Sequence, residues 1–233
     1  MKNQYFGDNK DLFKYDLVCY LIRRGLADRF TFIPMLTMND NTGQGKDRVR
    51  SKAKAGSENS CLVTFLDRFA DRNKRDVKKL RGFLKKYGIE AEIFGDYFHH
   101  EERERYFQDV SKKLPPKSLI FVDPDVGLQV KRTRDKHIKY CELNNLFERM
   151  DKSSILMLYQ HFPRIRTQSN IQKYFYDRSI KLKETGGSLL IDYIEDGEIR
   201  LFFLTKDKAL EKSLGKEISN YKETYPKLNI GKV

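Results

Sequence analysis

Short apolar runs alternate with longer amphipathic segments along most of the chain. The apolar runs are rich in β-branched and aromatic residues and are short enough for strands, so we expect strands at 30–38, 90–94, 118–122 and 155–159. Other segments carry apolar residues at the spacing of one helix face, which predicts helices at 9–25, 101–113, 143–150, 168–184 and 207–221. The alternation itself is typical of an α/β protein.

Two regions extend this pattern. The apolar stretch from Cys61 to Phe69 fits either a strand or the start of a helix. We interpret it as the start of one long helix that continues to Lys86 and whose many basic residues form a solvated outer face. The runs 188–194 and 198–204 flank Asp196-Gly197, a dipeptide typical of a hairpin turn. We therefore expect an antiparallel pair of strands there.

Together these elements predict an α/β fold: a three-layer sandwich with a mainly parallel, Rossmann-like sheet that ends in an antiparallel hairpin. The expected organisation is a single α/β domain over residues 1–233. A stretch near 40–58 combines glycines with lysines and arginines, and it is predicted to be a flexible basic loop.

Composition narrows the class of protein. The chain has 46 Lys+Arg against 33 Asp+Glu, a formal net charge of +13, and 39% hydrophobic residues, which is enough to build a core. No apolar run approaches the roughly 18 residues of a membrane span, and residues 1–5 lack the layout of a signal peptide. The three cysteines follow no metal-binding spacing. These features predict a cytoplasmic protein that has no membrane span, no disulfide scaffold and no zinc site.

The positive charge favours a polyanionic partner. We expect this partner to be nucleic acid, and DNA rather than RNA. In the alternative interpretation the charge only forms a solvated lysine-rich surface. Groups that follow predicted strands are the better candidates for phosphate contacts, because α/β proteins bind ligands there. With the basic loop, they make the expected phosphate-binding set Lys46, Arg48, Arg50, Lys131, Arg132, Arg134, Arg164 and Arg166.

Candidate chemistry lies at the ends of two apolar strands. Leu119 to Val122 runs directly into Asp123-Pro124-Asp125, and the strand 155–159 runs into Gln160-His161. If the two strands are neighbours, their acids and imidazole face one cleft. We therefore interpret Asp123, His161 and Asp125 as candidate catalytic residues. In the alternative interpretation Asp123 caps a turn and His161 is a structural histidine.

A third feature lies ahead of the first helix. Aromatic residues there are suited to stacking on a flat base, and a polar side chain to reading its edge. The expected substrate-binding residues, including two at the second strand end, are Tyr5, Phe6, Asp8, Asn9, Tyr159 and Gln160. A helix N-cap with a hydrophobic staple explains the N-terminal four equally well.

Other chemistries have weaker support. The adjacent residues His99-His100-Glu101-Glu102 point apart on a helix, so no metal site is expected. Asn41-Thr42-Gly43-Gln44-Gly45 lacks the third glycine of a dinucleotide-binding loop. The chain also contains no G-x-S-x-G nucleophile elbow and no P-loop, which argues against a serine hydrolase or an NTPase.

Three resemblances follow from these residues. A family of uncharacterised bacterial proteins is similar to this chain in four places: Tyr5-Phe6-Gly7-Asp8, Asp11 with Lys14-Tyr15, Asp123-Pro124-Asp125-x-Gly127-Leu128 and Tyr159-Gln160-His161-x-x-Arg164. Asp123-Pro124 and the terminal hairpin are similar to Rossmann-type S-adenosylmethionine-dependent methyltransferases of adenine amino groups, although Asp125-Val126 stands where that family has an aromatic. Asp123-Pro124-x-x-Gly127 and His161-x-Pro163 resemble the uracil-DNA glycosylase superfamily, which implies a water-activating acid.

Hydrolysis of an N-glycosidic bond needs an acid that positions water, a donor for the departing base and a pocket for a flipped nucleotide. Asp123 and His161 supply the first two without a cofactor. The expected function is therefore a DNA N-glycosylase acting in repair or in defence against foreign DNA. The alternatives are a methyltransferase using S-adenosylmethionine, a metal-dependent nuclease and a non-enzymatic nucleic-acid-binding module.

Overall fold

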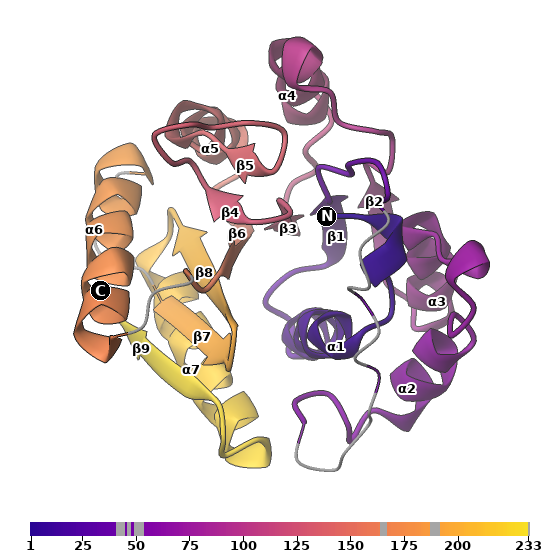
Figure 1. Ribbon diagram of the computed structural model, residues 1–233. Helices are drawn as coiled ribbons and strands as arrows, with labels where there is room; N and C mark the ends of the chain where they lie inside the picture. Colours follow the sequence, from indigo (N-terminus) through magenta and orange to yellow (C-terminus); the bar gives the residue numbers. More distant parts are fainter. Residues whose placement is uncertain (41–44, 46–47, 49–53, 164–166, 187–191, 233) are drawn as a thin grey trace.

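The computed structural model describes residues 1–40, 45, 48, 54–163, 167–186 and 192–232. A seven-stranded sheet with the order β2-β1-β3-β6-β8-β7-β9 runs through the molecule (Figure 1). Its parallel part contains β1 (Arg29–Ile33), β2 (Glu90–Ile93), β3 (Ser118–Val122) and β6 (Ile155–His161). Its antiparallel part contains β7 (Asp192–Asp196), β8 (Ile199–Thr205) and β9 (Asn229–Lys232).

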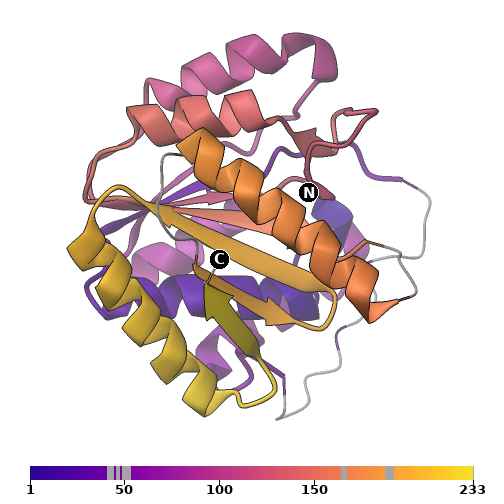
Figure 2. The same cartoon turned by 90° about the vertical axis from the view of Figure 1, so that its left-hand side faces the viewer.

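Helices cover both faces of this sheet (Figures 1 and 2). One face packs against α1 (Asn9–Arg23), α2 (Ser60–Asp67), α3 (Leu80–Lys86) and α7 (Lys208–Thr224). The other packs against α4 (Arg103–Ser111), α5 (Tyr140–Arg149) and α6 (Gln168–Gly186). The expected α/β sandwich with a mainly parallel core sheet is confirmed. Within the described residues, no helix combines the length and apolar character that crossing a bilayer requires.

The central strands are buried on both sides, which explains their unbroken apolar sequences. Along β3, Phe121 contributes to the core beneath α1, and its neighbours Ile120 and Val122 contribute to the core beneath α5. The same alternation continues in β6, where Met157 and Leu158 lie on opposite faces. The hairpin prediction is also confirmed. Asp196 pairs with Ile199, so β7 and β8 join through the two-residue turn Gly197-Glu198, in which Gly197 has a positive φ of 60°.

The prediction of one long basic helix is wrong. The chain forms α2 and α3 with two short 3₁₀ turns between them, at Arg72–Lys74 and Val77–Lys79. Asp71 accepts the backbone N–H of Asn73, and Asp76 accepts that of Lys78. Such local side-chain bonds compete with the helical hydrogen-bond pattern and start new turns. The apolar spacing continued through this region, but the two aspartates interrupt it.

The other differences concern strand ends and short strands. The strand expected at 30–38 ends at Ile33, because Pro34 has no N–H for the ladder and Met35 turns the chain with a φ of 42°. Three short strands were not predicted. They are β4 (Gly127–Leu128), its parallel partner β5 (His137–Ile138) and the edge strand β9, and each has few residues of strand-forming type.

Candidate active site at the carboxyl edge of the sheet

The two chemically interesting strand ends are neighbours. β3 and β6 pair in parallel, with Val122 opposite Leu158, so Asp123, which follows β3, and His161, which ends β6, lie at the same edge of the sheet. The amino end of α1 reaches this edge too, because α1 precedes β1 and runs in the opposite direction (Figure 1). Lys14 and Lys10, one helical turn apart, contact Asp123 and His161 respectively. The helix therefore joins the two strand ends.

A buried ion-pair network forms the floor of the site. The Lys14 ammonium lies 2.8 Å from Oδ2 of Asp123 and 2.7 Å from Oδ1 of Asp11, and it stands 5.1 Å from the ring centre of Tyr159. Burial alone would lower the pKa of Lys14, but the two carboxylates raise it above its ordinary value. Burial raises the pKa of Asp123, and Lys14 opposes that rise. Asp123 is only 2% exposed, so it holds Lys14 and does not face solvent.

The backbone around Asp123 is also fastened. The amino nitrogen of Met1 donates to the backbone oxygens of Asp123, Pro34 and Met35 at 3.0–3.3 Å. The N–H of Asp123 in turn donates to the carbonyl of Ile33, which continues the β1–β3 ladder by one residue. The acid is thus held at both its side chain and its main chain.

Asp8 is the carboxyl group nearest to the start of α1. It is the N-cap, and its Oδ1 accepts the N–H of Asp11 at 2.9 Å. Gly7 precedes it with a φ of 84° and donates its N–H to Oδ2 of Asp11, so both acids are oriented by the helix start. Burial, with the neighbouring charge of Asp11 as the second cause, raises the pKa of Asp8 to about 7. Asp8 keeps partial exposure, and it can therefore exchange a proton near neutral pH.

His161 lies at the more open end of the site, with a side chain that is 35% exposed. Its Nδ1 lies 2.8 Å from the carbonyl oxygen of Phe162, which requires a hydrogen on Nδ1. Nε2 lies 3.3 Å from the Lys10 ammonium and accepts from it in the neutral imidazole. Lys10 also pairs with Glu198 at 2.7 Å, a residue of the β7–β8 turn. The hairpin thereby contributes an acid to the site.

Gln160 has a structural position. Its side chain is fully buried, and its Oε1 accepts the N–H of Leu128 at 2.8 Å. Its Nε2 donates to the carbonyl of Val126 and to the hydroxyl of Tyr174. These bonds attach β4 to β6. Asp125 lies between β3 and β4, and its side chain is nearly buried. It stands 3.7 Å from the Lys136 ammonium.

The expected base-contact residues are mostly internal. Phe6 is fully buried, with its ring centre 5.0 Å from that of Phe69, so it belongs to the core. Asn9 and Tyr159 are also buried. Tyr5 is partly exposed and lies under the Lys2 ammonium. Of these side chains, Tyr5 and Asp8 retain access to solvent.

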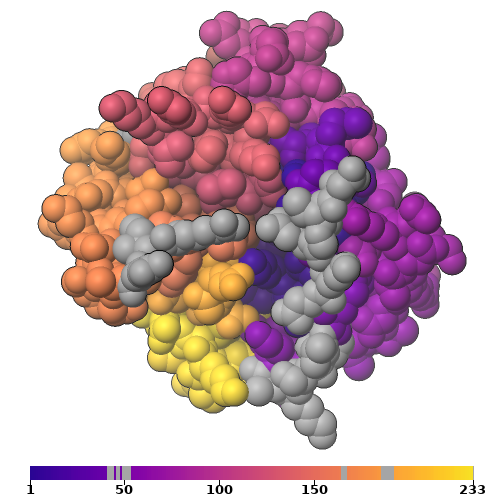
Figure 3. Space-filling view, viewed as in Figure 1, coloured from indigo at the N-terminus to yellow at the C-terminus, as the bar shows by residue number. Residues whose placement is uncertain are grey.

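The expected phosphate contacts divide into three groups. Lys131, Arg132 and Arg134 are exposed on the segment between β4 and β5, on the face that Figures 1 and 3 present. Arg48 donates to the backbone carbonyls of Phe6 and Leu66, which fastens the N-terminal segment to α2. Four further predictions fall outside the described residues: Lys46, Arg50, Arg164 and Arg166.

Sequence reasoning assigned no role to Lys10 or Glu198, and Asp11 and Lys14 entered only through the first resemblance. The spacing of Asp8, Asp11 and Lys14 was a usable signal, because side chains three residues apart share one helix face. Among the described residues, no three His, Cys, Asp or Glu side chains are grouped so that they could hold a metal ion.

The sequence and the structure were also compared with other proteins. Neither the family models, nor the curated proteins, nor the solved structures include a match to this chain.

Proposed function

We propose that this protein hydrolyses the N-glycosidic bond of a nucleic-acid base, with DNA as the expected substrate. The observation that carries the proposal is the meeting of α1 with the ends of β3 and β6. It brings a partly exposed carboxyl group with a pKa near neutrality, Asp8, to the same edge as the imidazole of His161. An exposed basic segment, which contains Lys131 and Arg132, borders the same edge.

Each group has a distinct role in this reaction. Asp8 accepts a proton from water as the water oxygen bonds to C1′ of the sugar, and the C1′–N bond breaks with its electron pair leaving on the base. A protonated His161 carries a hydrogen on Nε2 and transfers it to the departing base. Asp123 and Lys14 act as positioning residues, since both are buried. Asp125 is a further acid at this edge, beside Lys136.

Oligonucleotides with unmodified and modified bases provide the test. We expect the wild-type protein to release a free base, detected by mass spectrometry, and to leave an abasic site that breaks in alkali. Asp8→Asn should lose at least 100-fold in this rate, because general-base catalysis contributes about 10²–10⁴-fold. Binding of the oligonucleotide, followed by fluorescence anisotropy, should persist.

The matched control is Asp28→Asn, since Asp28 lies before β1 at the opposite edge of the sheet and pairs with Lys117. Base release that is unchanged in Asp8→Asn would refute the proposed role of Asp8. Strand breaks without alkali that depend on a divalent metal would instead indicate a nuclease. Binding without any turnover would indicate a non-enzymatic module.

A second candidate function is methyl transfer from S-adenosylmethionine. The observation that favours it is the antiparallel β7–β8 hairpin beside the parallel strands, together with Asp123-Pro124 directly after a central strand. Most of the glycine-containing stretch 41–45 falls outside the described residues. Calorimetry decides between the two functions: saturable binding of S-adenosylmethionine, with methylated base in the nucleic acid, would replace the glycosylase proposal.

A further inference from the structure

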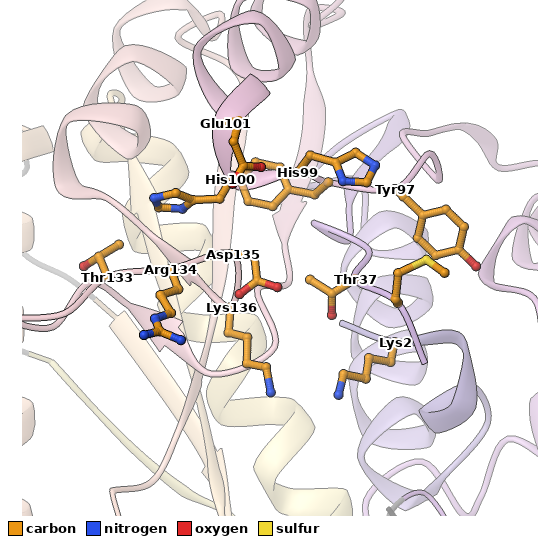
Figure 4. Close-up of a pocket in the computed structure, with 12 residues that line it drawn as sticks. Lys2, Thr37, Tyr97, His99, His100, Glu101, Thr133, Arg134, Asp135 and Lys136 are labelled. Carbon is orange, nitrogen blue, oxygen red and sulfur yellow. The ribbon is translucent and has the colours of Figure 1, made fainter. Parts of the chain in front are cut away.

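A cavity of about 580 Å³ lies beside the candidate active site (Figure 4). Its walls come from the segments that follow β1, β2 and β4, represented by Thr37, Tyr97 and Lys136. Backbone bridges between Lys2 and Thr37 and between Leu36 and Tyr97 connect these walls. A volume of about 300–1,000 Å³ is typical of small-molecule sites.

The cavity lies near the strands at which the connections of the chain change from one face of the sheet to the other. β1 lies between β2 and β3, and the connection from β1 to β2 passes through α2 and α3 on one face. The connection that leaves β3 passes through α5 on the other face. The chain therefore separates to opposite faces between β1 and β3. Met1 fills the space directly at these two strand ends, where its amino nitrogen bonds to the backbone oxygens of Pro34 and Asp123, and the cavity is lined by residues farther along the loops. Open α/β sheets bind their ligands at such switch points.

The lining combines three kinds of group. Tyr97 and Met38 are exposed large side chains, 44% and 63% accessible, although they line a cavity. Lys2 and Lys136 direct their ammonium groups toward one another across its lower side (Figure 4). Asp135 and Glu101 add carboxylates at other positions of the wall.

Each ammonium already has an acidic partner: Lys2 contacts Asp40, and Lys136 lies 3.7 Å from Asp125. The side chain of Lys2 is 4% exposed and that of Lys136 is 43% exposed, so Lys136 is the more open of the two cations. An anionic group placed between two ammonium ions interacts favourably with both. A phosphate group is the anion whose several oxygens can serve two donors at once.

We infer that this cavity binds a nucleoside monophosphate unit. Its phosphate contacts the Lys136 ammonium on the side that faces Lys2, its base stacks on the ring of Tyr97, and a wall carboxylate, Asp135 or Glu101, accepts the hydrogen bonds of the ribose hydroxyls. Acidic side chains take this role toward ribose in other α/β folds. The inference stands on the cavity alone and does not depend on the proposed glycosidic reaction.

Isothermal titration calorimetry with adenosine, guanosine, cytidine and uridine 5′-monophosphates tests the inference on the full chain. We expect saturable one-to-one binding of at least one nucleotide. The matching nucleoside without phosphate should bind at least tenfold more weakly. An oligonucleotide that ends in the same 5′-phosphorylated nucleoside shows whether the unit is taken from a strand end: tighter binding than the free nucleotide assigns it to strand ends, and weaker binding assigns it to free nucleotides.

Variants separate the two halves of the ligand. Lys136→Gln should reduce nucleotide affinity at least tenfold and should abolish the preference for nucleotide over nucleoside. Tyr97→Leu should weaken both ligands about equally, whereas Tyr97→Phe should retain binding because it keeps the ring. Lys113→Gln, at the opposite edge of the sheet, is the charge-matched control and should behave as wild type. Unchanged thermal unfolding confirms that each variant is folded.

Three results would overturn the inference. They are the absence of saturable binding with all four nucleotides, nucleotide binding that Lys136→Gln leaves unchanged, and inorganic phosphate binding as tightly as the nucleotide. The last result would assign the cavity to a simple anion. S-adenosylmethionine is titrated in parallel, and its tighter binding would assign the cavity to that cofactor instead.

Discussion

Lys14 is a buried ammonium that neutralises two carboxylates, Asp11 and Asp123. Lys14→Met keeps most of the side-chain volume but leaves both acids buried without their cation. We expect the free energy of unfolding to fall by about 3–5 kcal/mol, the usual cost of removing one partner of a buried pair. Urea unfolding measures this change.

Lys10→Met is the matched control, because Lys10 and its partner Glu198 have exposed side chains, 35% and 69%. Exposed pairs of this kind contribute about 0–1 kcal/mol. A loss for Lys14→Met that is no larger than the loss for Lys10→Met would show that the buried network does not hold the site together.

Asp8 predicts a dependence of stability on pH. Its pKa is about 7 in the folded protein, against an ordinary value of 3.8, so the folded state keeps this proton where the unfolded chain releases it. The stabilising contribution is fully present below about pH 4 and is lost as the pH rises through about 7. Asp8→Asn remains neutral and preserves the N-cap, since Asn caps helices as well as Asp.

The measurement is urea unfolding of both proteins between pH 4 and pH 8. We expect Asp8→Asn to gain stability relative to the wild-type protein as the pH rises, because only the wild-type protein acquires a negative charge at this poorly solvated position beside Asp11. A stability difference that stays constant over this range would mean that Asp8 titrates near its ordinary value.

At the scale of elements, the short strand β4 depends on Gly127. This residue has a φ of 132°, and a Cβ atom built on it would lie within 2.4–2.5 Å of the Gln160 side-chain amide. Gly127→Ala should therefore displace Gln160 and break its bond to Leu128. We expect a loss of about 1–3 kcal/mol, typical of strain and overpacking, in thermal or urea unfolding.

Gly82→Ala is the control for Gly127→Ala. Gly82 lies inside α3, has no positive φ, and a Cβ atom there would meet nothing within 4 Å. Alanine should stabilise this helix by about 0.5–1 kcal/mol. If both substitutions shifted stability in the same direction, the assigned role of Gly127 in holding β4 would be wrong.

Among the elements, hydrophobic patterns in the sequence were sufficient to predict some strands and insufficient for others. The buried strands β3 and β6 were predictable because both faces are covered and because residues 119–122 and 155–158 form unbroken apolar runs. The break between α2 and α3 was not, because Asp71 and Asp76 act through local bonds that hydrophobic spacing does not reveal. β4 was not predictable either, since its position depends on Gln160, 32 residues away from Leu128.

At the scale of the whole molecule, the net charge of +13 predicts nucleic-acid binding that weakens with salt. The exposed residues Lys131 and Arg132 border the carboxyl edge, so each alanine substitution there should reduce the slope of log affinity against log salt by about one. Lys112→Ala and Lys113→Ala, at the opposite edge, should leave the slope unchanged. Anisotropy titrations from 50 to 300 mM salt measure the slopes, and equal effects at both edges would contradict a binding face.

The sequence by itself determined the alternating helices and strands, the terminal hairpin, and the placement of Asp123 and His161 at strand ends. These features follow from local periodicity and turn chemistry, which neighbouring residues encode. Only the tertiary structure decided that Asp123 is paired with Lys14, that Asp8 is shielded enough to raise its pKa, and that Phe6 lies in the core. Burial and ion pairing depend on residues more than 100 positions apart, such as Lys14 and Asp123, and the folded sheet alone brings them together.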